Sequence, residues 1–135
     1  MRAEKALYYI LSHDSGVLAL VGGGTGRIFS GLLPQNKAWP AISMHLISAT
    51  RRPPIRAGVG QSLVDARVQV TAYAQTYPDV KALNEAVRLA LDRISGSFAG
   101  TQIVVSLLDL EGPDDYDADN QIFYQPQDFM VTHYE

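Results

Sequence analysis

Residues 64–91 read VDARVQVTAYAQTYPDVKALNEAVRLAL, and the spacing of the apolar residues changes once within them. From Val64 to Ala74, small apolar residues occupy every second position, which predicts a strand with one buried face. After a turn at residues 75–78, apolar residues follow a helical stripe formed by Val80, Leu83, Val87, Ala90, Leu91 and Ile94. Thr76 is a suitable N-cap for this helix, and Gly96 is expected to end it. The stretch therefore predicts a strand that leads directly into a helix.

The segments on either side of this stretch complete an α+β pattern. Before it we expect a helix at residues 2–12, a short helical turn at 17–21, and strands at 27–29, 41–49 and 63–74, the last two antiparallel. After it we expect a strand at 102–110 that is apolar on both faces, and a strand region at 121–134 that is broken near Pro126. The doubly apolar strand indicates either a central strand or a face buried in a partner subunit. The predicted fold is a mostly antiparallel sheet of about four to five strands, with two main helices packed on one face.

The composition indicates one soluble globular domain over residues 1–135. Apolar residues make up 47% of the chain and charged residues 19%, and there is no cysteine to form a disulfide, a thiolate metal site or a thiol nucleophile. The net charge of -3 lacks the basic footprint of nucleic-acid-binding proteins. No apolar run is long enough to span a bilayer, and the first residues lack a signal-peptide core. We therefore expect no membrane partner and no sequence-specific nucleic-acid partner.

The chain carries no recognisable catalytic or cofactor motif. The run GGGTGR at residues 22–27 follows a helical segment and lacks the ending of a phosphate-binding loop, so it indicates a helix stop and a loop. No serine lies in a Gly-x-Ser-x-Gly motif. His13, His45 and His133 lack the spacing of metal ligands. We therefore expect no enzyme activity, no cofactor and no metal centre.

The acidic segment at residues 111–120 reads EGPDDYDADN. The alternation of Asp115, Asp117 and Asp119 resembles the start of a calcium-binding loop. However, Asn120 stands where that loop needs glycine, and Pro126 stands where it needs a bidentate glutamate. A solvated or partner-facing hairpin loop is therefore the better interpretation, with a weak surface cation site as the alternative.

Residues 50–61 read TRRPPIRAGVGQ, which predicts a long loop rich in arginine, proline and glycine. Three interpretations are open: a solvated tip, contact with a nucleic-acid backbone, and docking onto an acidic surface of another subunit. The acidic segment of the same chain offers such a surface, and unlike charges on separate loops suit head-to-tail packing in a ring. We therefore predict an interface formed by Arg51, Arg52, Arg56, Asp114, Asp115, Asp117 and Asp119.

Short motifs follow one another in a distinctive order along nearly the whole chain. An N-terminal helix is followed by LALVGG at residues 18–23, RIF at 27–29, LPQ at 33–35 and WPAI at 39–42. The order culminates in RVQVTAYA at residues 67–74, a loop, and a helix with Ala82, Ala86, Val87, Ala90 and Leu91. In this order and spacing the chain resembles the small tail-completion proteins of long-tailed bacteriophages, also called tail terminators or head-to-tail joining proteins.

The resemblance implies a structural role in the tail or neck of a virion, after assembly in the host cytoplasm. Relatives form a six-fold ring on the head-proximal end of the tail tube, end its polymerisation and present a surface to the head connector. The implied partners are further copies of the chain, the tail tube protein and the head connector or adaptor protein, with the ring lumen as a passage for DNA. The alternatives are a head-completion or connector-adaptor protein, a tail-tube subunit, and a nucleic-acid or small-ligand binding domain of the host.

Overall fold

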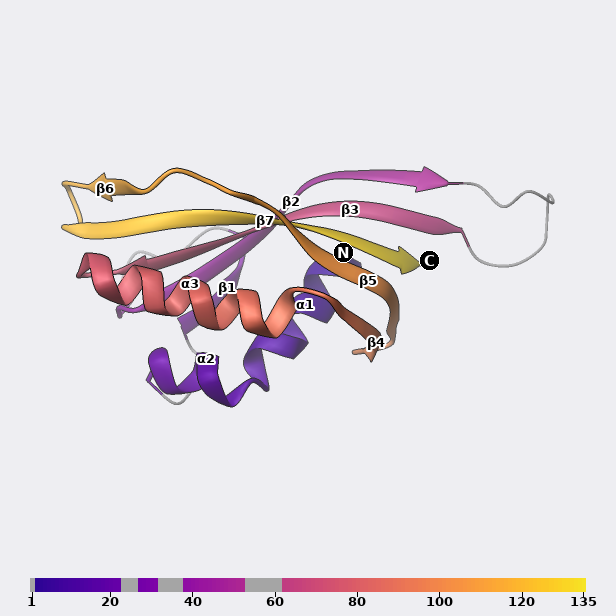
Figure 1. The fold of residues 1–135 in the computed structure, drawn as a ribbon, viewed down its shortest axis with the longest axis horizontal. Coiled ribbons are helices and arrows are strands. Elements are labelled where there is room, and N and C mark those ends of the chain that lie inside the picture. The colour runs from indigo at the N-terminus through magenta and orange to yellow at the C-terminus, as the bar shows by residue number, and fades with distance from the viewer. Residues whose placement is uncertain (1, 23–26, 32–37, 53–61) are drawn as a thin grey trace.

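Seven strands of the described chain form one sheet, and three helices cover one of its faces (Figure 1). The computed structural model describes residues 2–22, 27–31, 38–52 and 62–135. The helices are α1 (Arg2–Ser12), α2 (Ser15–Leu20) and α3 (Tyr77–Leu91). The strands are β1 (Ile28–Ser30), β2 (Ala41–Arg52), β3 (Leu63–Ala74), β4 (Ile94–Phe98), β5 (Thr101–Glu111), β6 (Asp115–Asp117) and β7 (Ile122–Tyr134).

The sheet order is β1-β2-β3-β7-β5-β4, and β6 pairs with β7 beyond the end of β5. Only β1 and β2 run parallel; every other pair is antiparallel. The α+β class and the mostly antiparallel sheet are therefore confirmed. The predicted count of four to five strands is too low, and α2 adds a third helix to the two main ones.

The strand-to-helix stretch folds as the sequence predicts up to Leu91. The apolar face of β3, from Val64 to Ala74, is buried against the helices, and α3 buries its predicted stripe through Leu91. The Thr76 side chain caps α3 by accepting a hydrogen bond from the Asp79 backbone N–H at 3.3 Å. These two faces form much of the core, together with α1, α2 and the inner residues of β7.

The predicted end of α3 at Gly96 is wrong. The helix ends at Leu91 because its C-cap, Asp92, is extended with a ψ of 133°, and Arg93 then takes a left-handed φ of 60° that turns the chain. The Asp92 carboxylate accepts a hydrogen bond from the Leu108 backbone N–H at 2.8 Å, which ties the chain to β5. Ile94 therefore begins β4 instead of extending the helical stripe.

The predicted break near Pro126 is also wrong, because β7 runs continuously through it opposite Thr71 of β3. Proline has no N–H for a sheet ladder, so a central strand tolerates it only where that donor has no strand partner. Pro126 lies where β5 has ended and β6 has not begun, and its carbonyl accepts a hydrogen bond from Gly112 N at 2.8 Å. Part of the predicted acidic loop is in fact the short strand β6, paired with residues 122–124 of β7.

β2 and β5 are each exposed along part of their length. β2 continues to Arg52, three residues beyond its predicted end, and a bulge between Leu46 and Ser48 interrupts its register with β3. Leu46 lies on the same face as Ile42 and Met44, but it is 41% exposed whereas they are buried. β5 is a central strand only near its start; towards its end Leu107 and Leu110 are 44% and 56% exposed.

Candidate subunit interface

The two predicted basic residues that the structure describes lie at the end of β2, not in a loop. The side chains of Arg51 and Arg52 are 63% and 55% exposed, and each guanidinium makes a two-point contact with a carboxylate. Arg52 donates to Asp65 of the neighbouring strand β3 through Nε at 2.9 Å and Nη2 at 3.1 Å. Arg56 lies outside the described residues. We call Arg51 and Arg52 the basic end.

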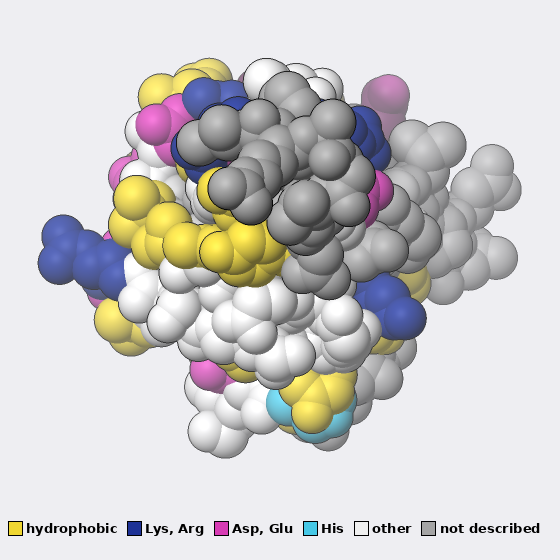
Figure 2. Space-filling model, turned by 90° about the vertical axis from the view of Figure 1, so that its right-hand side faces the viewer, with side chains coloured by type: hydrophobic (Ala, Val, Ile, Leu, Met, Phe, Trp, Pro, Cys, Tyr) yellow, Lys and Arg dark blue, Asp and Glu magenta, His cyan; other side chains and the backbone are white. Residues whose placement is uncertain are grey.

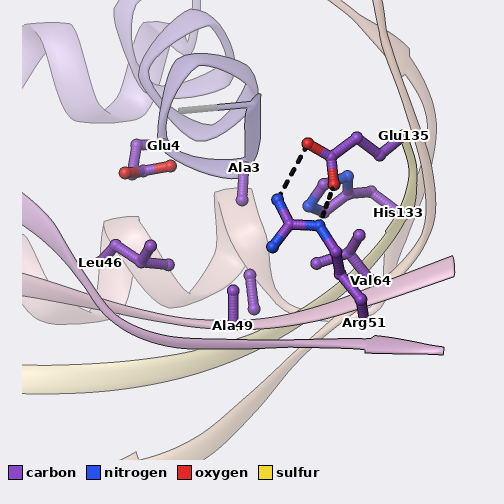
Figure 3. A pocket seen from close by; sticks show the side chains of 9 residues that line it. Ala3, Glu4, Leu46, Ala49, Arg51, Val64, His133 and Glu135 are labelled. Carbon is purple, nitrogen blue, oxygen red and sulfur yellow. Dashed lines mark hydrogen bonds and ion pairs between the residues drawn. The ribbon is translucent and has the colours of Figure 1, made fainter. Parts of the chain in front are cut away.

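Arg51 reaches from β2 to the last residue of the chain, as Figure 3 shows. Its Nε and Nη2 atoms donate to the two carboxylate oxygens of Glu135 at 2.9 and 3.1 Å, and this bonding raises the pKa of the guanidinium. The pair lines a small cavity of about 60 Å³ next to Glu4 and His133. This volume is far below that of a ligand pocket, for which a few hundred Å³ is usual (roughly 300–1,000 Å³). The cavity beside Arg51 is therefore too small for an ordinary ligand.

The predicted acidic residues lie at the other end of the sheet, on and around β6 (Figure 1). Asp114 accepts hydrogen bonds from Lys81 Nζ at 2.5 Å and from Tyr77 OH at 2.8 Å, and these bonds lower its pKa. Asp115 accepts a hydrogen bond from Tyr124 OH at 3.0 Å, which raises the pKa of the tyrosine. We call the four predicted residues the acidic end: Asp114, Asp115, Asp117 and Asp119.

The Asp117 carboxylate closes the turn between β6 and β7, because it accepts hydrogen bonds from Asp119 N at 3.0 Å and from Asn120 Nδ2 at 2.8 Å. Asp119 is exposed on that turn. No cluster of three or more histidine and acidic side chains suited to a metal ion occurs among the described residues. The carboxylates of this end thus serve hydrogen bonds within the hairpin and with α3.

The basic and acidic ends do not meet within one chain. Arg51 is opposite Val64 on β3, whereas Asp115 is in register with Tyr124, which is opposite Tyr73. Nine residues of β3 separate these levels, a distance of about 30 Å along the strand at roughly 3.3 Å per residue. Viewed towards the basic end, dark blue basic side chains lie next to magenta acidic ones rather than in one basic patch (Figure 2). A contact between the two ends therefore requires a second copy.

Comparison with known proteins places this architecture in a family. The family model of tail completion protein gp17 matches residues 5–134. The chain belongs to this tail completion family. It is therefore a structural component of a phage-like virion, in its tail or neck.

A solved structure shares the fold of this tail completion chain. It is a chain of the "Virion of native gene transfer agent (GTA) particle", with a TM-score of 0.68 and 18% sequence identity. The alignment covers 96% of this chain and 92% of that one. A search of curated proteins finds no match. Within the described residues of the tail completion chain, no helix is long and apolar enough to cross a membrane.

One charged cluster of this tail completion chain was not predicted from the sequence. Arg67 of β3 donates to Asp109 of β5 at 2.5 Å and to Asp128 of β7 at 3.2 Å, and the bond to Asp109 is the main cause of its raised pKa. Gln69 donates to the other oxygen of Asp128 at 3.1 Å. The cluster lies on the sheet face opposite the helices. Strand alternation assigns Arg67 and Gln69 to the polar face, but only the strand order identifies their partners.

The three histidines of the tail completion chain lie in separate settings. His13 stacks on Tyr9 in the first helix with a ring separation of 4.1 Å, His45 is exposed on β2, and His133 is buried on β7. Another hollow, of about 310 Å³, is lined by Tyr77, Tyr116, Phe123 and two carboxylates of the acidic end. It is open and aromatic, and it brings no histidine to those carboxylates. Such a surface suits packing against another protein better than proton-transfer chemistry.

Proposed function

We propose that this protein forms a ring that caps the head-proximal end of the tail tube, ends tube polymerisation and joins the tail to the head connector. The observation that carries the proposal is the tail completion family match over residues 5–134, almost the full chain. The proposed partners are further copies of the chain, the tail tube protein and the head connector or adaptor protein. Six copies are proposed for the ring.

The separation of the charged ends supports ring assembly. Each subunit carries exposed arginines at one end of its strands and a group of aspartates at the other, about 30 Å apart by the roughly 3.3 Å rise per strand residue. Unlike patches on one molecule produce head-to-tail contacts, which close into a ring when the rotation between copies permits. We include Arg56 in the basic surface with Arg51 and Arg52, and we assign the acidic end as its counterpart.

The ion pairs within the chain leave this interface available. The side chains of Arg51 and Arg52 are both more than half exposed, and exposed ion pairs contribute little stability because water screens them. Their guanidinium groups can therefore exchange a carboxylate of their own chain for one of a neighbour at small cost. Polar contacts of this kind set orientation and association rate more than affinity.

Electron microscopy of the purified protein, alone and with tail tubes, tests the ring directly. We expect rings with a central hole in solution or on one end of each tube. Label attached to the protein in whole particles should appear at the neck. Label along the whole tube would instead indicate a tube subunit, and monomers alone under both conditions would contradict the proposal.

A triple variant tests the basic surface separately. Replacing Arg51, Arg52 and Arg56 with alanine should reduce the joining of tails to heads. The matched control replaces exposed Lys5 and Arg93 with alanine, which removes positive charge elsewhere and should leave joining unchanged. Equal virion yields from the triple variant and the control would remove these arginines from the interface.

A further inference from the structure

One edge of the sheet is open along most of β2. β1 pairs only with residues 42–44 of β2, and no strand of the described chain pairs with the outer side of residues 45–52. All eight of these residues are exposed, including Leu46 at 41% and Ile47 at 47%. We call residues 45–52 the open β2 edge. Unpaired strand edges with apolar side chains are templates for pairing with another chain.

The opposite edge is open over a different segment. β4 pairs with β5 only as far as Ser106. The next backbone N–H that points outward, that of Leu108, donates a hydrogen bond to the carboxylate of Asp92. Beyond that point residues 109–111 and then β6 form the edge of the sheet: their inner side faces β7, and no described strand pairs with their outer side. We call residues 109–117 the acidic edge. It contains five carboxylates, with Leu110 56% exposed and Tyr116 47% exposed.

The strand order fixes how these edges would meet. β2, β3, β7 and β5 alternate in direction at each step, so β5 runs opposite to β2, and β6 pairs antiparallel to β7 as β5 does. A second copy with its sheet facing the same way therefore presents its acidic edge antiparallel to the open β2 edge of the first. Each copy retains one edge of each kind, so the contact repeats from copy to copy.

We infer that neighbouring subunits join edge to edge, with the open β2 edge of one copy against the acidic edge of the next. Charge selects this arrangement over its symmetric alternatives. Two acidic edges would bring carboxylates together, which is repulsive, and two open β2 edges would offer the arginines no carboxylate of the other edge, because residues 45–52 contain none. The mixed pairing joins arginines to carboxylates and places the exposed Leu46 and Leu110, which lie on opposite faces of the sheet, at the same contact. The inference rests on the ring of the proposed function and names its subunit contact.

Both edges contain a β-bulge, which disfavours pairing with an arbitrary regular strand. β2 is irregular between Leu46 and Ser48, and β5 between Leu108 and Leu110. Bulges increase local twist and discourage indiscriminate addition of strands. Identical subunits bring the same two irregular edges together at every contact, so one matching arrangement serves the whole assembly. An unrelated regular strand would not match the bulges. The edges thus favour a repeating contact between copies over aggregation.

Cysteine pairs test the contact, because the natural chain has no cysteine. His45, Ser48 and Thr50 lie on the same sheet face as Leu110, by their register with Gln69, Arg67, Asp65 and Asp128. Each of the three should be replaced by cysteine in combination with Leu110→Cys, which samples the length of the open β2 edge. The Cα atoms of residues that face each other on antiparallel strands are about 4.5–5.5 Å apart, a separation that a disulfide can span. The matched control is Ser15→Cys with Ala82→Cys, at exposed positions of α2 and α3.

At least one double variant should give a ladder of covalent oligomers larger than a dimer under oxidising conditions, which reductant removes. The control pair should give none. Rings visible by electron microscopy without such a ladder would overturn the edge contact while leaving the ring intact. Disulfide dimers from Ser48→Cys alone would indicate symmetric β2 pairing and also overturn it. Failure of the parent protein to form rings, alone or with tail tubes, would remove the ring and this contact together.

Discussion

Arg67 of β3 connects three strands, because its side chain bonds to Asp109 of β5 and Asp128 of β7 on the sheet face opposite the helices. Its guanidinium contacts Asp109 on one side and Asp128 on the other, and Gln69 supplies a further donor to Asp128. Asp128 is only 9% exposed, so these donors replace most of the water around its carboxylate. A buried carboxylate without a partner is unstable, and the loss of Arg67 would remove the cation that Asp109 and Asp128 share.

Replacing Arg67 with methionine should therefore lower the free energy of unfolding, because it leaves two carboxylates near each other without their shared cation. The urea midpoint measured by circular dichroism should fall. The control is Arg93→Met, since the side chain of Arg93 is 86% exposed and lies 3.9 Å from Asp92. Its midpoint should stay close to that of the parent. Equal midpoints for the two variants would contradict a structural role for Arg67.

Asp114 gives a prediction about pH. Its pKa lies below the ordinary value, first because Lys81 donates to it and second because Tyr77 does. A depressed pKa in the folded state stabilises the fold above the unfolded-state pKa, which is about 3.9 for aspartate. That stabilisation is lost as the pH falls from there through the lower folded-state pKa.

Asp114→Asn should thus be less stable than the parent at pH 6, and the difference should narrow as the pH falls below about 4, the ordinary pKa range of aspartate. Urea midpoints at pH 6, 4 and 3 measure the trend. Asp119→Asn, at an exposed turn position, is the matched control and should differ little from the parent at each pH. A constant difference for Asp114→Asn across this range would refute the assigned contacts.

At the scale of elements, local chemistry controls where α3 begins and long-range contacts control where it ends. Thr76→Ala should destabilise the protein by about 1 kcal/mol, because the Asp79 N–H loses its side-chain acceptor. The melting temperature should fall by about 4 °C, the change that roughly 1 kcal/mol produces in a domain of this size. Thr76→Ser keeps the hydroxyl and should melt near the parent. If both variants lose the same stability, packing of the threonine methyl group is responsible instead.

The same contrast explains which elements the sequence could predict. β3 and most of α3 follow from the spacing of apolar residues, and α1 agrees with its predicted bounds. β4 could not be predicted, because Ile94 continues the helical stripe, and the chain is redirected by contacts with β5, from Asp92 to Leu108 and from Arg93 to Ser106. β6 has aspartate, which is disfavoured in strands, at two of its three positions, and it exists through its register with β7.

The candidate interface was predictable in composition but not in geometry. The sequence identifies the arginines and aspartates, yet Arg51 bonds to Glu135, 84 residues away, and Lys81 to Asp114, 33 residues away. Such pairings depend on the strand order, which residue spacing does not encode. The two apolar faces of residues 102–110 allowed two interpretations, a central strand or a face covered by another subunit, and the exposure of Leu107 and Leu110 fits the second at the end of β5.

At the scale of the whole molecule, the two charged ends make the subunit polar along its strands. If each ring contact joins the basic end of one copy to the acidic end of the next, the two ends can be reversed in separate variants. One variant carries Arg51→Glu and Arg52→Glu, and the other carries Asp115→Lys and Asp119→Lys. Each alone brings like charges together at every contact, so each should form fewer rings than the parent.

Mixing the two variants in equal amounts should restore ring formation. In an alternating ring, the reversed basic end of one variant meets the reversed acidic end of the other, and the next contact joins the two unchanged ends. All contacts are then between opposite charges, and an even number of copies, such as six, closes without a mismatch. Light scattering and electron microscopy measure the restored fraction, and a control with Lys5→Glu and Arg93→Glu should form rings alone. Rings from either reversed variant alone, at the parent's yield, would show that these ends do not face each other, whereas recovery only on mixing requires a head-to-tail contact.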